Sequence, residues 1–159
     1  MNGSYLLALG LGIGIVAGLR SLTAPAVTAW AAYLGWLDLQ GSRLAFMAST
    51  VAVVVFSLLA IGELIGDKLP KIPRRTAIAP LLARIFSGAL CGACLAVAAH
   101  QALLPASLIA GLGGIIGAFA GYEIRRRLVT QLHLPDVIVA VCEDLIAIGL
   151  AVFIFARPC

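Results

Sequence analysis

The 159 residues are 62% hydrophobic and only 11% charged, and the mean hydropathy is +1.10. An ordinary soluble domain carries about 25% charged residues, so this composition excludes that class and indicates an integral membrane protein. The net charge of +4 does not point to nucleic acid, because the basic residues lie in short stretches between apolar runs, where they act as orientation signals.

Several apolar runs approach the length of about 20 residues that a helix needs to cross a bilayer. They cover residues 5–19, 44–64, 78–99, 107–122 and 137–156. The runs are too long for transmembrane strands and lack the alternating pattern of an outer-membrane barrel. The predicted fold class is therefore all-α, a polytopic helical membrane bundle of about five transmembrane helices in one domain that covers residues 1–159.

A shorter apolar segment, residues 21–37, follows the first run. Pro25 near its start suits the first turn of a helix. Trp30, Tyr33 and Trp36 lie three residues apart, which would place the aromatic rings on one helical face, and such rings favour the headgroup boundary. We favour a re-entrant or interfacial helix here over a full short span.

A glycine pattern in the first run recurs in the fourth run at a constant offset. It comprises Gly10, Gly14 and Gly18 in the first run, and Gly113, Gly117 and Gly121 in the fourth. The pattern suggests repeat-like units at 5–67 and 107–156, with 78–99 as a linking span, although glycine at every fourth residue is also a common packing pattern. If segment 21–37 does not cross the membrane, the two glycine runs are antiparallel and form an inverted repeat. If it crosses, they are parallel.

Two basic clusters are separated by two apolar runs and must therefore lie on the same side of the membrane. They contain Lys68, Lys71, Arg74 and Arg75 in one loop, and Arg125, Arg126 and Arg127 in the other. The positive-inside tendency places both clusters in the cytoplasm, with the C-terminus outside and, in the five-span arrangement, the N-terminus inside. A bacterial inner membrane is the expected setting. The second cluster is also a candidate contact for lipid headgroups.

Glu143 and Asp144 lie about one third of the way into the last apolar run. An ionisable side chain at this depth costs about 2.5 kcal/mol or more unless it meets a partner or water, so such groups indicate a transport or proton-relay site. Because adjacent helical residues project about 100° apart, one carboxylate would pair and the other would face a cavity. Arg84 in the third run needs an anion and is the expected partner.

Further candidates are weaker. Glu63 and Asp67 are four residues apart at the cytoplasmic end of the second run, which places both on one helical face. They would form an acidic mouth, or else pair with nearby lysines. Glu123 lies one turn before Arg127, where a structural ion pair is favoured. Arg20 occupies the position that matches Glu123 in the repeat, and Arg20 and Pro25 are secondary site candidates.

We expect no cofactor and no metal. Cys91 and Cys94 have the spacing of a redox motif but lack its strand and βαβ context, so small-residue helix packing is favoured. The chain has no P-loop, no G-x-S-x-G elbow and no H-E-x-x-H pair. We therefore do not expect an enzyme.

Four segments together resemble a family of small bacterial membrane proteins known as domain of unknown function 4126. They are residues 18–25, 62–70 and 83–89, and Pro135-Asp136 followed by Glu143-Asp144. The resemblance covers nearly the whole chain and implies that Glu63, Asp67, Lys68 and Pro70 belong to a family element. Many members carry Leu-Asn-Ala where this chain has Leu19-Arg20-Ser21. The resemblance implies no particular activity.

The leading hypothesis is a small transporter or channel, dimeric through a glycine face, that moves a small ion or solute with coupled protonation of Glu143 or Asp144. One alternative is lipid handling by a flippase, a scramblase or a lipid-binding membrane protein. The other alternative is a membrane scaffold without transport, in which the charges hold the helices together. Nothing in the sequence selects the substrate.

Overall fold

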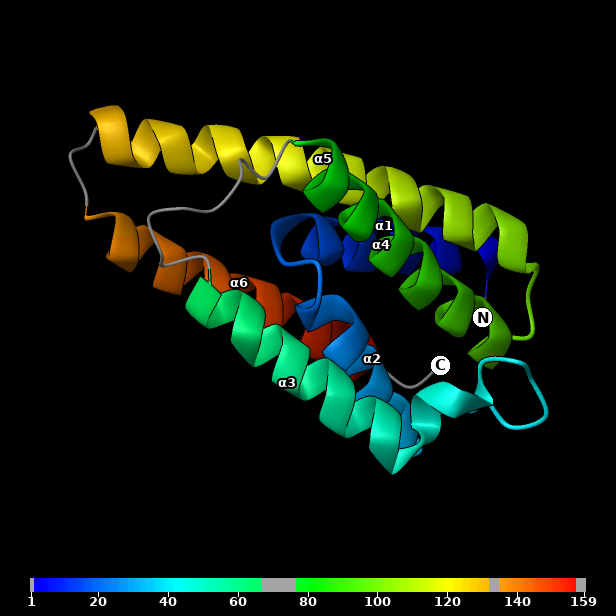
Figure 1. Cartoon of the computed structure of the whole chain (residues 1–159). Helices are drawn as coiled ribbons and strands as arrows, with labels where there is room; N and C mark the ends of the chain where they lie inside the picture. The colour runs from blue at the N-terminus through cyan, green and yellow to red at the C-terminus, as the bar shows by residue number, and fades with distance from the viewer. Residues whose placement is uncertain (1, 67–76, 132–134, 157–159) are drawn as a thin grey trace.

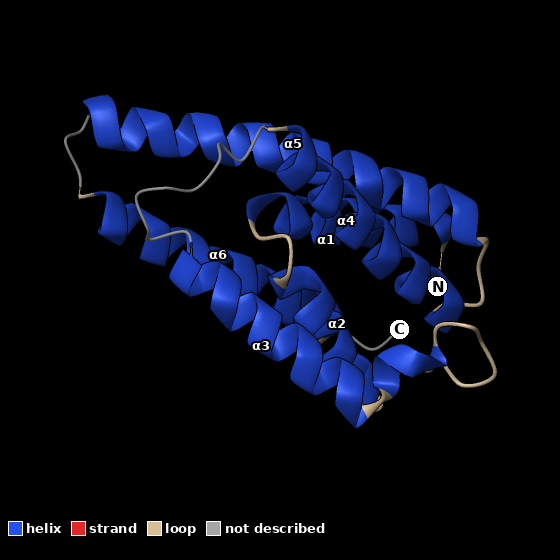
Figure 2. Cartoon of the chain, in the orientation of Figure 1, coloured by secondary structure: helices blue, strands red, loops and turns tan. Residues whose placement is uncertain are grey.

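The computed structural model describes residues 2–66, 77–131 and 135–156. Within these ranges the chain forms α-helices, one 3-10 helix and no strand, which confirms the all-α fold class (Figures 1 and 2). The elements are α1 (Gly3–Leu19), α2 (Thr23–Tyr33), η1 (Ala45–Ala48), α3 (Thr50–Gly66), α4 (Ile78–Ala98), α5 (Leu103–Gln131) and α6 (Asp136–Phe155).

Three helices, α4, α5 and α6, are long and apolar enough to cross a membrane by themselves. The helices α1 and α3 are apolar but have 17 residues each. At a rise of 1.5 Å per residue they extend about 25 Å. The hydrocarbon core of a bilayer is slightly thicker, at about 30 Å. The described part of the chain is thus a helical membrane protein with spans of unequal length.

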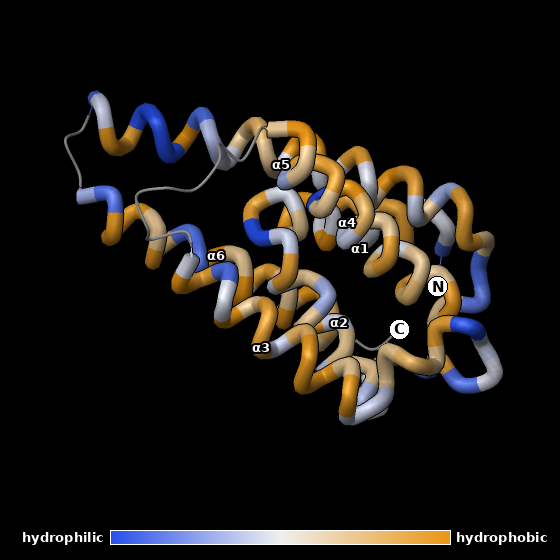
Figure 3. The backbone as a smooth tube through the Cα atoms, in the orientation of Figure 1, coloured by the Kyte–Doolittle hydropathy of each residue, from blue (hydrophilic) through white to orange (hydrophobic). Residues whose placement is uncertain are grey.

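Two boundaries differ from those expected from the sequence. The second span begins at Thr50 rather than at residue 44, because residues 45–48 form η1, and Ser49 Oγ then accepts a hydrogen bond from Ala52 N at 3.1 Å. Helix α5 continues to Gln131 rather than ending at residue 122. Its last turns are hydrophilic (Figure 3) and are stabilised by ion pairs of Glu123 with Arg126 and Arg127.

The core of the bundle is formed by α1, α4 and α5, which approach closely because glycines lie at their contacts. A Cβ atom added to Gly88 would lie 2.7 Å from the carbonyl oxygen of Ala110, which is too close for any side chain. Small residues at such positions allow membrane helices to pack backbone to backbone. The repeated glycines of α1 and α5 therefore pack against each other within one chain.

The glycine contacts also establish the direction of these helices. Position 10 of α1 lies next to Ala106, position 14 next to Ala110 and position 18 next to Gly114, so α1 and α5 are parallel. Parallel glycine runs are expected if segment 21–37 crosses the membrane. An inverted repeat would have required them to be antiparallel. The N-terminal end of α1 then lies at the opposite end of the bundle from Arg125, which corrects the five-span arrangement with the N-terminus on the basic side (Figure 1).

Helix α2 is the short helix expected in segment 21–37. Its 11 residues extend about 16 Å, but eight of them are buried among α3, α4 and α6, so the helix is internal rather than interfacial. Pro25 lies in its first turn, where the missing N–H breaks no helical hydrogen bond. The helix ends at Tyr33 and the chain turns at Gly35, with φ of +78°, so Trp36 does not continue the helical face of Trp30 and Tyr33.

Candidate functional site

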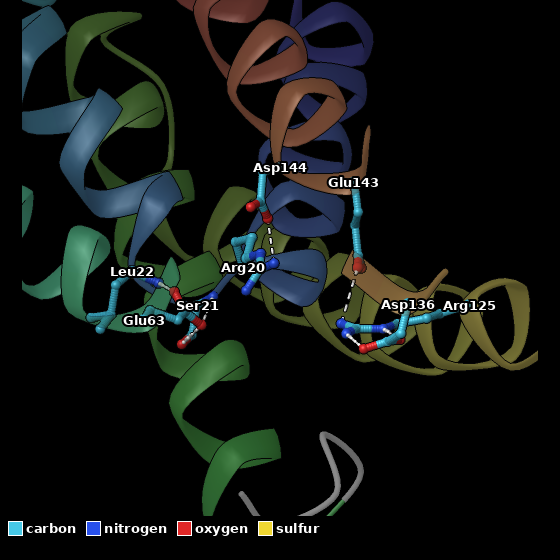
Figure 4. A network of polar contacts seen from close by, with 8 residues as sticks. All are labelled: Arg20, Ser21, Leu22, Glu63, Arg125, Asp136, Glu143 and Asp144. Carbon is cyan, nitrogen blue, oxygen red and sulfur yellow. Dashed lines mark hydrogen bonds and ion pairs between the residues drawn. The ribbon is translucent and has the colours of Figure 1, made fainter. Parts of the chain in front are cut away.

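The centre of the candidate site is an ion pair between Arg20 and Asp144 (Figure 4). Arg20 directly follows α1 and its side chain is completely buried, while the Asp144 side chain on α6 is 11% exposed. A guanidinium at the end of a helix complements the negative end of the helix dipole. The backbone N–H of Arg20 still donates to Val16 O at 2.8 Å, so the last turn of α1 holds the backbone of Arg20 in place.

Arg20 therefore takes the role that the sequence suggested for Arg84. Arg84 is also buried, at 3% exposure, and lies on α4 against α5, where its carbonyl oxygen would be 2.8 Å from a Cβ added to Gly114. The guanidinium that meets Asp144 is nevertheless that of Arg20. In the sequence Arg20 resembles an ordinary charged boundary after an apolar run. Only the antiparallel packing of α1 on α6 brings it to Asp144.

Glu63 on α3 is bound to the start of α2. Its Oε1 accepts hydrogen bonds from Ser21 N at 2.9 Å and Ser21 Oγ at 2.7 Å, and its Oε2 accepts one from Leu22 N at 2.8 Å. Ser21 and Leu22 form the turn directly before Thr23, the first residue of α2, and a carboxylate there complements the positive end of the helix. Glu63 thus caps α2 from another helix. Asp67, its expected companion, lies outside the described residues.

The four residues Arg20, Ser21, Glu63 and Asp144, which we call the central cluster, bring together the α1–α2 turn, α3 and α6 (Figure 4). Here the helical structure is interrupted between α1 and α2. The Arg20 guanidinium faces the Asp144 carboxylate, and the N–H groups of the turn face the Glu63 carboxylate. Interrupted helices that present charged groups and helix ends inside a bundle are the usual form of ion and solute sites in transporters.

Glu143 belongs to a different set of contacts. Its Oε2 lies 3.8 Å from the guanidinium of Arg125 on α5. Arg125 in turn donates two hydrogen bonds to the Asp136 carboxylate, at 2.8 and 2.7 Å. We call Arg125, Asp136 and Glu143 the peripheral cluster. The adjacent carboxylates of α6 therefore diverge, Asp144 toward the central cluster and Glu143 toward α5 (Figure 4). This agrees with the angle of about 100° between neighbouring residues on a helix.

The remaining charged candidates lie on the last turns of α5, beyond its apolar part and outside the span. Arg126 and Arg127 contact Glu123 at 3.0 and 2.7 Å. The hydrogen bond donated by Arg127, together with the bond and charge of Arg126, holds the pKa of the Glu123 carboxyl below its ordinary value. Each of the three arginines expected to meet lipid headgroups therefore already has a carboxylate partner.

A crevice of about 240 Å³ lies between α5 and α6, next to the peripheral cluster. Apart from Arg125 and Glu143, its walls are almost entirely apolar. They consist of Leu19, Gly121, Ile124, Leu128, Ile138, Val139, Cys142 and Ile146. No sequence pattern predicts this crevice, because it exists only where α5 and α6 diverge.

Cysteines and possible metal ligands are further features of the chain outside the two clusters. Cys91 and Cys94 are buried in α4, as expected for residues in helix packing. Over the described ranges, no three His, Cys, Asp or Glu side chains gather in a way that could hold a metal ion.

None of the curated proteins and none of the solved structures matches the chain. One family model does match, and it covers residues 7–159, a range that contains both clusters. This agrees with the resemblance noted from the four sequence segments. The chain therefore belongs to the family described as Domain of unknown function (DUF4126).

Proposed function

We propose that this protein is a bacterial inner-membrane transporter or channel that moves a small ion or solute through the central cluster, with protonation of Asp144 coupled to the movement. The observation that supports it is the completely buried Arg20 paired with Asp144. An ionisable pair within a membrane bundle is by default a functional-site signal.

Packing alone is a weaker explanation for this pair. Removing two charges from water costs several kcal/mol for each ion, and the attraction between them returns about the same amount. Apolar side chains of similar volume would often hold the helices equally well or better. In a chain with only 11% charged residues, a charge pair in the interior is therefore better explained by function.

The arrangement suggests how protonation would act. While Asp144 is ionised, it holds the Arg20 guanidinium. Protonation weakens that attraction, so an anion or water can compete for the Arg20 guanidinium. Ser21 and Leu22, the next two residues, donate hydrogen bonds to Glu63, so a displacement of Arg20 would reach the start of α2. The movable part would be the α1–α2 turn between α3 and α6.

The test uses the purified full-length chain in liposomes that contain a pH-sensitive dye, with proton, sodium, potassium and chloride gradients imposed in turn. We expect the wild-type protein to discharge at least one gradient faster than protein-free liposomes. Asp144→Asn should abolish that flux. Arg20→Lys, which keeps the charge but loses the planar fork of donors, should reduce it. Asp38→Asn, in an exposed loop, is the matched control and should leave the flux unchanged.

Two results would overturn the proposal. One is a folded Asp144→Asn variant that retains the wild-type flux. The other is a wild-type protein that discharges none of the gradients.

The crevice between α5 and α6 favours a second candidate function, lipid translocation. A reporter-lipid assay in the same liposomes distinguishes it from ion or solute transport. Loss of stability in Asp144→Asn without flux in any sample would instead support the scaffold hypothesis.

A further inference from the structure

The crevice between α5 and α6 lies apart from the central cluster. The wall residues Ile124, Ile138 and Ile146 are each more than half exposed, so the protein itself does not cover them. In a helical membrane protein such a surface faces lipid hydrocarbon. Water does not fill an apolar cavity of this kind favourably, whereas an apolar molecule does. The occupant therefore needs an apolar part that enters from the bilayer.

The crevice also lies at the level where α5 changes character. The first part of α5 is largely apolar, whereas its last turns carry most of its charged residues, with apolar residues between them (Figure 3). This change marks the headgroup boundary on the side of the basic residues. An occupant with its apolar part in the crevice would have its polar end at Arg125 and Asp136. A membrane phospholipid has this form.

The charges beside the crevice do not favour an anionic headgroup. Arg125 contacts two carboxylates, Asp136 and Glu143. Arg126 and Arg127 pair with Glu123 and do not line the crevice. Asp136 is 56% exposed and Arg125 lines the crevice with 16% of its side chain exposed, so both ends of their pair are accessible to a ligand.

We infer that the crevice binds one zwitterionic phospholipid of the phosphatidylethanolamine type, with an acyl chain between α5 and α6. The phosphate replaces Asp136 at the Arg125 guanidinium, and the ammonium binds the released Asp136 carboxylate. One ion pair within the protein is then replaced by two between protein and lipid, and each is a charge-assisted hydrogen bond. A choline headgroup cannot donate such a bond to Asp136, and a glycerol headgroup carries no cation for it.

The test is native mass spectrometry of the full chain after extraction from nanodiscs. The nanodiscs contain equal amounts of phosphatidylethanolamine, phosphatidylcholine and phosphatidylglycerol. The wild-type protein should retain one phospholipid, with the ethanolamine lipid enriched about fivefold over the choline lipid, as one ion pair of about 1 kcal/mol implies. Asp136→Asn should still retain a phospholipid, but without preference between these two lipids.

The apolar part of the proposal has its own pair of variants. Cys142→Trp fills the crevice and should abolish retention. Leu145→Trp, on an exposed part of α6 that does not line the crevice, should retain lipid as the wild-type protein does. Retention that survives Cys142→Trp would overturn the crevice as the binding site. Preference for the glycerol lipid, or an ethanolamine preference that survives Asp136→Asn, would overturn the headgroup assignment.

Discussion

The two neighbouring carboxylates of α6 show how one residue step changes the surroundings of a charge. Asp144 is buried against Arg20, whereas Glu143 lies 3.8 Å from an arginine that already holds Asp136. The loss of Asp144 removes a carboxylate from a completely buried guanidinium, whereas the loss of Glu143 leaves Arg125 bonded to Asp136. The two positions should therefore respond differently to the same chemical change.

Asp144→Asn is expected to lower the free energy of unfolding by about 3 kcal/mol, because the completely buried Arg20 guanidinium loses the charge of this carboxylate. Glu143→Gln should cause a much smaller loss, since Arg125 keeps its two hydrogen bonds to Asp136. Thermal or denaturant unfolding in detergent measures both. Equal losses for the two variants would contradict the assignment of Arg20 to Asp144.

Glu63→Gln tests the cap on α2. The amide can accept hydrogen bonds only through its oxygen, so one of the N–H groups of Ser21 and Leu22 loses its acceptor, at a cost of about 1 kcal/mol. Amide hydrogen exchange should become faster at the start of α2 and stay unchanged in the apolar part of α5. Unchanged exchange at Ser21 and Leu22 would show that Glu63 is not the cap.

At the scale of the elements, glycines have opposite roles in different helices. Several glycines of α1, α4 and α5 lie where backbones touch, among them Gly14, Gly88 and Gly117, but a Cβ atom added to Gly62 or Gly149 would meet nothing within 4 Å. The repeated glycine faces of α1 and α5 are thus used inside the chain. A homodimer through a glycine face, which we still propose, would have to use α3 or α6.

Gly88→Ala and Gly149→Ala form a matched pair. The first places a methyl group 2.7 Å from the backbone oxygen of Ala110, so α4 and α5 must separate and stability should fall markedly. The second adds a methyl group in open space, and the better helix propensity of alanine should leave stability unchanged or raise it by up to about 1 kcal/mol. Thermal unfolding of the two variants in the same detergent provides the comparison. A stable Gly88→Ala variant would argue against the close packing of these helices.

At the scale of the whole molecule, the parallel packing of α1 and α5 determines which ends share a side of the membrane. The N-terminal end of α1 lies near the start of α5, since position 10 contacts Ala106. The arginines of α5 lie at the far end of the same helix. Ser4 and Thr130 should therefore lie on opposite sides of the bilayer.

Single cysteines at these two positions test the arrangement, in a background with Cys142→Ser and Cys159→Ser. A membrane-impermeant maleimide added to intact cells should label Ser4→Cys, and Thr130→Cys should react only after the membrane is opened. Gln101→Cys, in the turn before α5, is the control and should behave like Ser4→Cys. Labelling of Ser4 and Thr130 from the same side would restore the five-span arrangement.

The membrane class, the all-α fold and the approximate positions of the long helices follow from the sequence. Their physical basis is local: lipid requires that each span satisfy its own backbone, and apolar runs of sufficient length are visible without knowledge of their neighbours. The resemblance to the family rests on short segments that are equally local. The expectation that Asp144 and Glu143 are charges at membrane depth also needed only their positions in the last apolar run.

The tertiary structure decided which charges meet. Arg20 is 124 residues from Asp144 along the chain, Ser21 is 42 from Glu63, and each contact depends on the direction in which α1 and α2 pass through the bundle. That direction results from glycine contacts between backbones, whose geometry no single run contains. The pairing of Asp144 with Arg20 rather than Arg84, the cap on α2 and the crevice beside α5 therefore appear only once the helices have packed.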